Sequence, residues 1–316
     1  MELSLLLSFA LAATLTLFGA AIAFGTRKRP PPLQALTTAL ERLGSMRFPA
    51  TKSFAARDGS ALSYREYPVA GARQVAVLLH GSIHDSRTMH SIGVLLSMQG
   101  VAVYALDVRG HGGSGRRGDI DYIGQLEDDL VDLVGLIRSQ HAEARLALVG
   151  HSAGGGFALR FAGGPDGALF DRYVAVAPFL HHAGRMVREE AVEWAVAAVP
   201  RFTALHYLHA ARLPWFQRLP VLLCAVPPGS DCTADYSFRL ALNFRPHLDW
   251  QNDIRNIRSK TSILIGEADE LFNAEAYAGL LQGLNERVGV QVLKAVDHTT
   301  VCIKASAVMA IRKALV

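Results

Sequence analysis

Short, continuous apolar runs that alternate with helical stretches constrain this chain more than any other feature of its sequence. Strands that are apolar on both faces belong in a parallel sheet covered by helices on both sides. The expected strands are Thr51–Ala56, Ala61–Tyr67, Val75–Leu79, Val101–Leu106, Leu146–Val149, Tyr173–Ala177, Ser262–Ile265 and Val290–Lys294. The alternation predicts an α/β fold with a mostly parallel, doubly wound sheet of eight strands, in which the first two strands form an antiparallel lead-in.

One long stretch interrupts this alternation. Phe179–Asp253 separates the sixth and seventh expected strands and contains helical segments and several prolines. Because it is too long for a plain crossover, we interpret it as a helical cap or lid. The predicted organisation is a core at 51–178 and 254–316 with a cap at 179–253.

The amino-terminal segment is expected to be a separate unit. Leu3–Phe24 carries no charged residue, and a basic Arg-Lys-Arg triplet at 27–29 and three prolines follow it. As a helix this run spans roughly 33 Å, close to the hydrocarbon thickness of a bilayer. Because basic flanks stay on the cytoplasmic side, we expect a single-pass transmembrane anchor at 1–25, a linker at 26–50 and a cytoplasmic main domain.

Two other interpretations of this run are open. A cleaved signal peptide would use Ala21 and Ala23 as its Ala-x-Ala site, although its n-region has no basic residue. The second alternative is that the run forms a buried helix of the globular domain. Gln34–Gly44 is expected to form a short amphipathic helix or linker, since its leucines recur at helical spacing.

Composition excludes several classes of protein. With 50% hydrophobic and 19% charged residues, the chain is not intrinsically disordered. Its net charge of +4 comes without a long basic block, which argues against nucleic-acid binding. Cys224, Cys232 and Cys302 are too few for a disulfide scaffold. No phosphate-binding or dinucleotide-binding glycine motif and no metal-ligand spacing is found, so no cofactor or metal is expected.

The strongest local signal for chemistry is Gly150–Gly154, which reads Gly-His-Ser-Ala-Gly between an expected strand and a helical stretch. A sharp strand-to-helix turn presents its central serine at the carboxyl edge of a sheet, and flanking glycines avoid backbone clashes there. We therefore interpret Ser152 as a nucleophile. The alternative is a serine that only caps a glycine-rich helix start.

A serine hydroxyl becomes a good nucleophile near neutral pH only with a base and an acid that orients the base. In a sheet of this order both should follow later strands, with the acid before the histidine. Asp269 follows the seventh expected strand and His298 follows the last. We expect Asp269 to be the acid and His298 the base, with Glu267 and Glu270 as alternative acids.

The tetrahedral intermediate of acyl transfer needs two hydrogen-bond donors for its oxyanion. One should be the amide of Ala153, which directly follows the serine. The second should be the amide of Ser82 in the His80-Gly81-Ser82 loop after the third strand, where Gly81 permits close backbone approach. His80 is expected to order this loop, and His84 and Asp85 either line the pocket or are solvated.

These motifs together resemble the α/β-hydrolase superfamily. The residues that carry the resemblance are His80–Ser82, Asp107–Ser114 (Asp-Val-Arg-Gly-His-Gly-Gly-Ser) and Gly150–Gly155, and within the superfamily they look like the monoacylglycerol lipase, lysophospholipase and serine aminopeptidase group. The resemblance covers about Ser53–Ile311. It implies a triad of Ser152, Asp269 and His298, oxyanion donors at Ser82 and Ala153, and a cap after the sixth strand.

The activity that this resemblance implies is hydrolysis of carboxylic esters through an acyl-enzyme on Ser152. We expect lipid-like esters such as monoacylglycerol or lysophospholipid, because a membrane anchor keeps the enzyme beside such substrates. One alternative is an aminopeptidase-type enzyme, which needs acidic groups for a free amine; Glu189, Glu190 and Glu193 are candidates. The other is a non-catalytic binding member of the fold.

Overall fold

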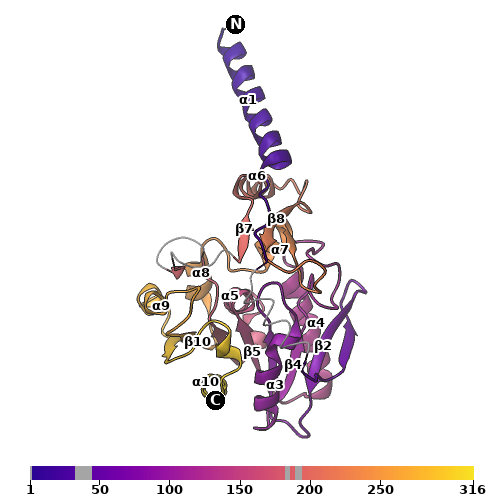
Figure 1. Ribbon diagram of the computed structural model, residues 1–316, viewed down its shortest axis with the longest axis vertical. Coiled ribbons are helices and arrows are strands. Elements are labelled where there is room, and N and C mark those ends of the chain that lie inside the picture. The colour runs from indigo at the N-terminus through magenta and orange to yellow at the C-terminus, as the bar shows by residue number, and fades with distance from the viewer. Residues whose placement is uncertain (1, 33–44, 182–185, 189–193) are drawn as a thin grey trace.

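The computed structural model describes residues 2–32, 45–181, 186–188 and 194–316 (Figure 1). The helix or linker expected at Gln34–Gly44 therefore lies outside the described residues. A central sheet of eight strands has the order β1-β2-β4-β3-β5-β6-β10-β11. The strands are β1 (Thr51–Ala55), β2 (Ala61–Tyr67), β3 (Gln74–Leu79), β4 (Ala102–Leu106), β5 (Arg145–His151), β6 (Arg172–Val176), β10 (Lys260–Gly266) and β11 (Val288–Leu293).

The pairing of these strands confirms the expected mostly parallel sheet. β1 pairs antiparallel with β2, and β2 pairs antiparallel with β4. All pairings from β4 through β3, β5, β6 and β10 to β11 are parallel. Because parallel strands end at the same edge, the loops after β3, β5, β10 and β11 meet there.

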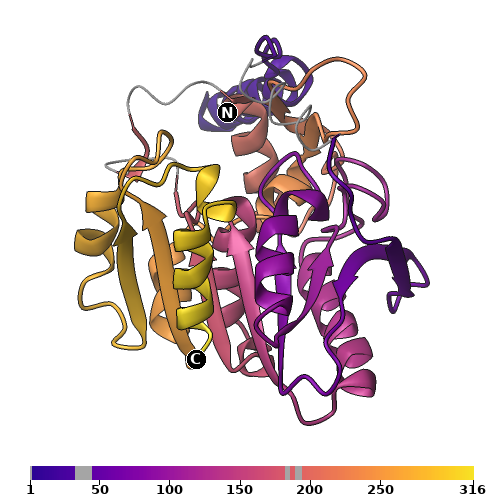
Figure 2. The same cartoon turned by 60° about the horizontal axis from the view of Figure 1, so that its bottom comes forward.

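Helices cover both faces of the sheet, as the continuous apolar strands require. Every residue of β3 is buried: Val75 and Val77 belong to one apolar cluster and Ala76 and Leu78 to the other. The first cluster contains α4 (Gln125–Gln140), α5 (Ala153–Gly163), α8 (Trp250–Asn256) and α9 (Ala274–Leu281). The second contains α3 (His90–Ser97) and α10 (Ala305–Ala314), which lie side by side in front of the sheet in Figure 2.

The segment after β6 differs from the purely helical cap that we expected. It contains α6 (Val199–Ala210) and α7 (Phe238–Asn243), but also a three-stranded sheet of β7 (Ala195–Ala197), β8 (Pro220–Cys224) and β9 (Asp235–Ser237). None of these three strands was expected; β7 and β9, of three residues each, are too short to show an alternating pattern. The expected boundary at Asp253 falls inside α8, which packs against the core helix α5.

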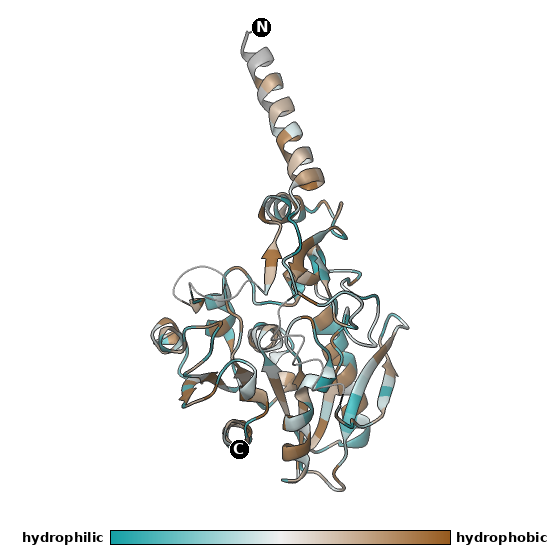
Figure 3. Cartoon of the chain, viewed as in Figure 1, coloured by the Kyte–Doolittle hydropathy of each residue, from teal (hydrophilic) through white to brown (hydrophobic). Residues whose placement is uncertain are grey.

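The amino-terminal helix α1 (Glu2–Phe24) projects from the rest of the molecule (Figures 1 and 3). None of its apolar window Leu7–Phe24 is buried, so the interpretation as a buried helix of the globular domain is wrong. Its length and composition qualify it as a candidate membrane span, a test that a signal sequence passes as well. Only its carboxyl-terminal end meets the cap, where Phe18 contacts Tyr207 of α6 at 6.1 Å between ring centroids.

Candidate active site

Ser152 occupies the sharp turn between β5 and α5. Its backbone is at φ 53° and ψ −117°, a strained conformation for a residue with a side chain. Its amide donates to the Val176 carbonyl at 2.9 Å, and its carbonyl accepts from the Gly156 amide at 2.9 Å. A Cβ at Gly150 or Gly154 would collide with neighbouring backbone, so the turn requires both glycines of the pentapeptide. The turn therefore presents Ser152 at the edge where the strands end.

The structure brings Ser152, His298 and Asp269 together in one hydrogen-bonded chain. His298 Nε2 lies 3.1 Å from Ser152 Oγ, and His298 Nδ1 lies 2.9 Å from Asp269 Oδ2. With Nδ1–H donating to the carboxylate, Nε2 is free to accept the serine hydroxyl proton. Residues that are 146 positions apart in the sequence thus form the arrangement that activates a serine.

Backbone donors hold Asp269 in place. It is fully buried, and its Oδ1 accepts from the amides of Leu271 and Phe272 at 2.9 and 2.8 Å. The alternative acids face elsewhere: Glu270 accepts from the backbone amide of His298 at 2.9 Å, and Glu267 lies 3.5 Å from the Ala295 amide. Asp269 is therefore the carboxylate that contacts the imidazole ring.

His151, the second residue of the pentapeptide, supports the backbone of His298. Its Nε2–H donates to the His298 carbonyl at 2.9 Å, and the two rings lie 4.9 Å apart. Burial, together with the neighbouring imidazole of His298, lowers the pKa of His151 to about 3, so His151 is neutral near pH 7. Sequence reasoning missed this role, although its position beside the nucleophile was a usable signal.

The loop after β3 passes directly over the nucleophile. A Cβ on Gly81 would lie 3.2 Å from the Cβ of Ser152, so the backbone approaches closely where a second oxyanion donor is needed. In the described part of the chain, no acceptor takes the amide of Ser82 or that of Ala153. The ring of His80 links this loop to the next, because its Nε2 accepts from the Val108 amide at 3.0 Å.

Tyr236 of the cap strand β9 reaches into the same loop. Its hydroxyl accepts from the amide of Ile83 at 2.9 Å and lies 2.6 Å from Nε2 of His111. Ile83 directly follows Ser82 and has a φ of 64°, which a β-branched residue rarely adopts. Burial raises the pKa of Tyr236 well above its usual value, so the hydroxyl stays protonated and donates to His111. The cap thus contacts the loop after β3, a link that the sequence did not reveal.

Charged residues near this loop have structural roles. Asp107 holds two loops together by accepting from the amides of Ser86 at 2.9 Å and Gly113 at 3.0 Å. Asp85 is buried and pairs with Arg87 at 2.6 Å, so it is not a solvated residue. Burial lowers the pKa of His84 to about 4. Among the described residues, no group of three or more histidine, cysteine or acidic side chains has the geometry to hold a metal ion.

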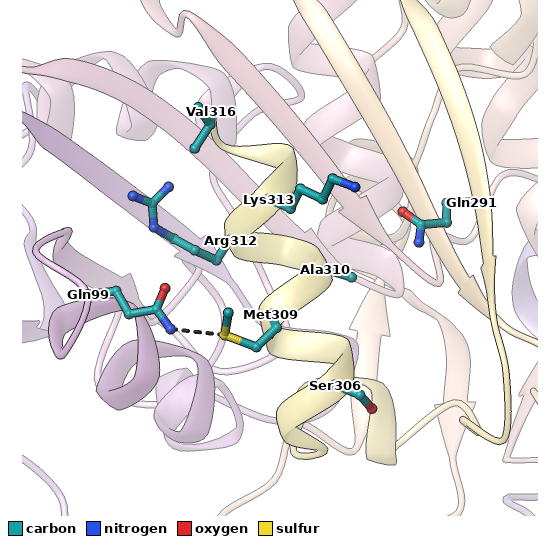
Figure 4. Close-up of a pocket in the computed structure, with 8 residues that line it drawn as sticks. All are labelled: Gln99, Gln291, Ser306, Met309, Ala310, Arg312, Lys313 and Val316. Carbon is teal, nitrogen blue, oxygen red and sulfur yellow. Dashed lines mark hydrogen bonds between the residues drawn. The ribbon is translucent and has the colours of Figure 1, made fainter.

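A surface pocket elsewhere on the molecule has no connection to this chemistry. Figure 4 shows that it lies along α10, where Gln99 Nε2 contacts Met309 Sδ at 3.0 Å. None of its lining residues belongs to the triad or to the oxyanion loop. The candidate site therefore remains at the carboxyl edge of the sheet, beneath the cap.

Comparison with known proteins agrees with this architecture. A family model described as serine aminopeptidase, S33, matches residues 70–301. The monoacylglycerol lipase of Mycolicibacterium smegmatis is 33% identical over 111 residues, which cover 34% of this chain and 40% of that protein. The match to this curated relative thus spans less than half of its length.

Two solved structures extend the likeness over most of the chain. A soluble variant of the monoglyceride lipase from Saccharomyces cerevisiae aligns with a TM-score of 0.59 at 16% identity, covering 90% of this chain and 96% of that one. A membrane phospholipase A aligns with a TM-score of 0.59 at 17% identity, covering 99% of this chain and 97% of that one. At these identities the likeness establishes a common fold.

Proposed function

Because this chain belongs to the serine aminopeptidase (S33) family of α/β-hydrolases, we propose that it is a serine hydrolase that cleaves carboxylic esters. The observation that carries the proposal is the hydrogen-bonded chain from Asp269 through His298 to Ser152, at 2.9 and 3.1 Å. A non-catalytic member of the fold has no need for this convergence, which therefore favours an enzyme.

The proposed reaction is acyl transfer to water. Ser152 Oγ attacks the ester carbonyl while His298 Nε2 takes its proton, and Asp269 stabilises the imidazolium that forms. The amides of Ser82 and Ala153 donate to the oxyanion. His298 then gives the proton to the leaving alcohol. Water, activated by His298, attacks the acyl-enzyme, releases the carboxylic acid and restores the Ser152 hydroxyl.

We infer lipid-like esters, such as monoacylglycerol or lysophospholipid, as the substrate class. Relatives named monoacylglycerol lipase, monoglyceride lipase and membrane phospholipase A support this class. The apolar helix α1 supports it independently, because an enzyme held at a bilayer meets lipid esters there.

The contacts at the end of α1 support a membrane tether rather than a cleaved signal. Arg201 of α6 donates to the carbonyls of Ile22 at 2.8 Å and Ala23 at 3.1 Å, and so caps the carboxyl-terminal end of α1. The exposed aromatic side chains Tyr207, Trp215 and Phe216 belong to the same cap. Full-length protein should stay in the membrane fraction after carbonate washing; release into the supernatant with a shortened amino terminus would favour cleavage.

Covalent labelling tests the assignment of the nucleophile. A fluorophosphonate probe should label the wild-type protein and the control Ser139→Ala, whose serine is exposed on α4, but not Ser152→Ala. Equal labelling of Ser152→Ala would remove Ser152 from its role.

The family description favours an aminopeptidase as the second candidate. The glutamates expected to bind a free amine, Glu189, Glu190 and Glu193, lie outside the described residues. Faster turnover of aminoacyl-nitroanilides than of p-nitrophenyl esters would reverse the ranking.

A further inference from the structure

Arg245 is a buried cation that has no counter-ion among the residues described by the structure. Only 6% of the residue is exposed, and its Nη2 is buried with no hydrogen-bond partner. The one bond found for its guanidinium runs from Nε to the Pro246 carbonyl at 3.4 Å, which is long. No carboxylate in the described part of the chain pairs with it. A buried charge of this kind is costly unless something compensates it.

The other buried arginines show how unusual this is. Arg109 pairs with Asp129 at 2.7 Å, Arg160 with Glu127 at 2.7 Å and Arg239 with Asp119 at 2.8 Å. Arg201 has no carboxylate but donates to three carbonyl oxygens. Arg245 alone among these five has no carboxylate partner and only one long bond to a carbonyl, so its buried Nη2–H lacks a partner within the described residues.

The guanidinium of Arg245 lies close to two aromatic rings of the cap segment. Its Cζ is 6.0 Å from the ring centroid of Phe179, which follows β6, and 6.0 Å from that of Phe202 on the cap helix α6. Both rings are within cation–π distance of the guanidinium. A group that reaches Nη2 therefore enters beside the first residues of the cap, directly after β6.

Short-range contacts connect this position to the nucleophile. The Phe179 amide donates to the Ser152 carbonyl at 3.0 Å. Pro246 packs so closely on Gly156 that a Cβ there would lie 2.9 Å from its Cδ. Gly156 is one helical turn after Ser152, about 6 Å along the axis of α5. These contacts place Arg245 next to the segment that carries Ser152.

We propose that Arg245 binds an anionic oxyacid group, a phosphate or a carboxylate, carried by the ester substrate. The planar fork of a guanidinium binds such groups through charge-assisted hydrogen bonds, and the bound anion supplies the missing counter-ion. This inference rests on the proposed ester hydrolysis and narrows it: an anionic ester, such as a lysophospholipid, is a better substrate than the neutral monoacylglycerol. Burial and the nearby Arg160 lower the pKa of Arg245 to about 10, which leaves it charged at neutral pH.

The test compares three esters that have the same acyl chain and differ in head group: monoacylglycerol, its 3-phosphate, and the matching acyl ester of glyceric acid. Each is assayed with full-length wild type, Arg245→Gln and Arg245→Lys. In Arg245→Gln, the ratio of kcat/KM for the phosphate or the carboxylate ester to that for monoacylglycerol should fall about 10- to 100-fold, as expected for a lost hydrogen bond to a charged group. Arg245→Lys should restore much of the ratio because it keeps the charge.

Arg218→Gln is the matched control, since this cap arginine is 65% exposed and should leave the ratio unchanged. An unchanged ratio in Arg245→Gln, or an equal loss on all three esters, would overturn the inference and assign Arg245 a packing role between its two rings. Added inorganic phosphate separates a free anion from a substrate group. Inhibition of monoacylglycerol turnover that disappears in Arg245→Gln, without any head-group preference, would assign a free anion and also overturn it.

Two outcomes distinguish a failure of this inference from a failure of the proposed function. Fluorophosphonate labelling of wild type together with turnover of any of the three esters upholds ester hydrolysis, whatever Arg245→Gln does. Absence of both labelling and turnover removes the proposed function, and this inference falls with it.

Discussion

The edge of the central sheet and the cap above it satisfy their polar groups in opposite ways. At the edge, Asp269 is fully buried yet accepts three hydrogen bonds, two of them from backbone amides. In the cap region, Arg245 is almost as deeply buried and has a free nitrogen. Asp269 therefore has its partners within the described residues, whereas Arg245 Nη2 does not. This difference suggests that the core supplies the general chemistry and the cap the choice of substrate.

The largest expected effect lies in the core and tests whether its network is catalytic. Asp269→Asn keeps the shape of the side chain, but its amide no longer stabilises the imidazolium or the required tautomer of His298. We expect kcat to fall about 10⁴-fold. Glu270→Gln, which still offers an oxygen to the His298 amide, should stay within about fivefold of wild type. A mild loss in Asp269→Asn, measured by ester turnover under saturating substrate, would contradict the assigned triad.

A smaller effect is expected where the cap meets the core. Tyr236→Phe removes the hydroxyl that accepts from Ile83 and contacts His111, so the oxyanion loop loses its link to the cap. Because this loop acts on the transition state, kcat should fall about 10- to 100-fold with little change in KM. The control is Tyr207→Phe, whose ring is 60% exposed on α6. A rise in KM at constant kcat would instead place Tyr236 in substrate binding. The contribution of the cap would then be to substrate binding alone.

The smallest effect concerns the junction of the cap with α1. Arg201→Gln should lower the melting temperature in detergent by a few degrees, because three hydrogen bonds from a cation are lost. In a chain that lacks residues 1–25 the same substitution should cost less, since two of its three acceptors are already gone. Equal shifts in both backgrounds would mean that the helix end and the cap are not energetically coupled.

The sequence predicted the sheet, and it pointed to three side chains that the structure brings together, for a physical reason. Buried parallel strands are apolar throughout, and the loops that follow them carry Ser152, Asp269 and His298 in a fixed chain order. The contacts of Tyr236 with Ile83 join residues 153 positions apart and follow no periodic pattern. Arg245 lacks a carboxylate partner in the described part of the folded chain. A sequence does not show which side chains fail to approach one another, so this could not be predicted. The cap strands β7 and β9 were missed because three residues are too few to alternate, and the five-residue β8 was missed with them.

The direct seating of α1 on the cap has a consequence for how the membrane-bound enzyme that we propose finds its substrate. Arg201 binds the last turn of α1, so the main domain is held directly at the end of the helix. We expect its height above the bilayer to be nearly constant. It then encounters lipids by lateral diffusion in two dimensions. Turnover should accordingly follow the mole fraction of ester within the vesicle surface, and diluting the vesicles in buffer at fixed composition should leave the rate per enzyme unchanged.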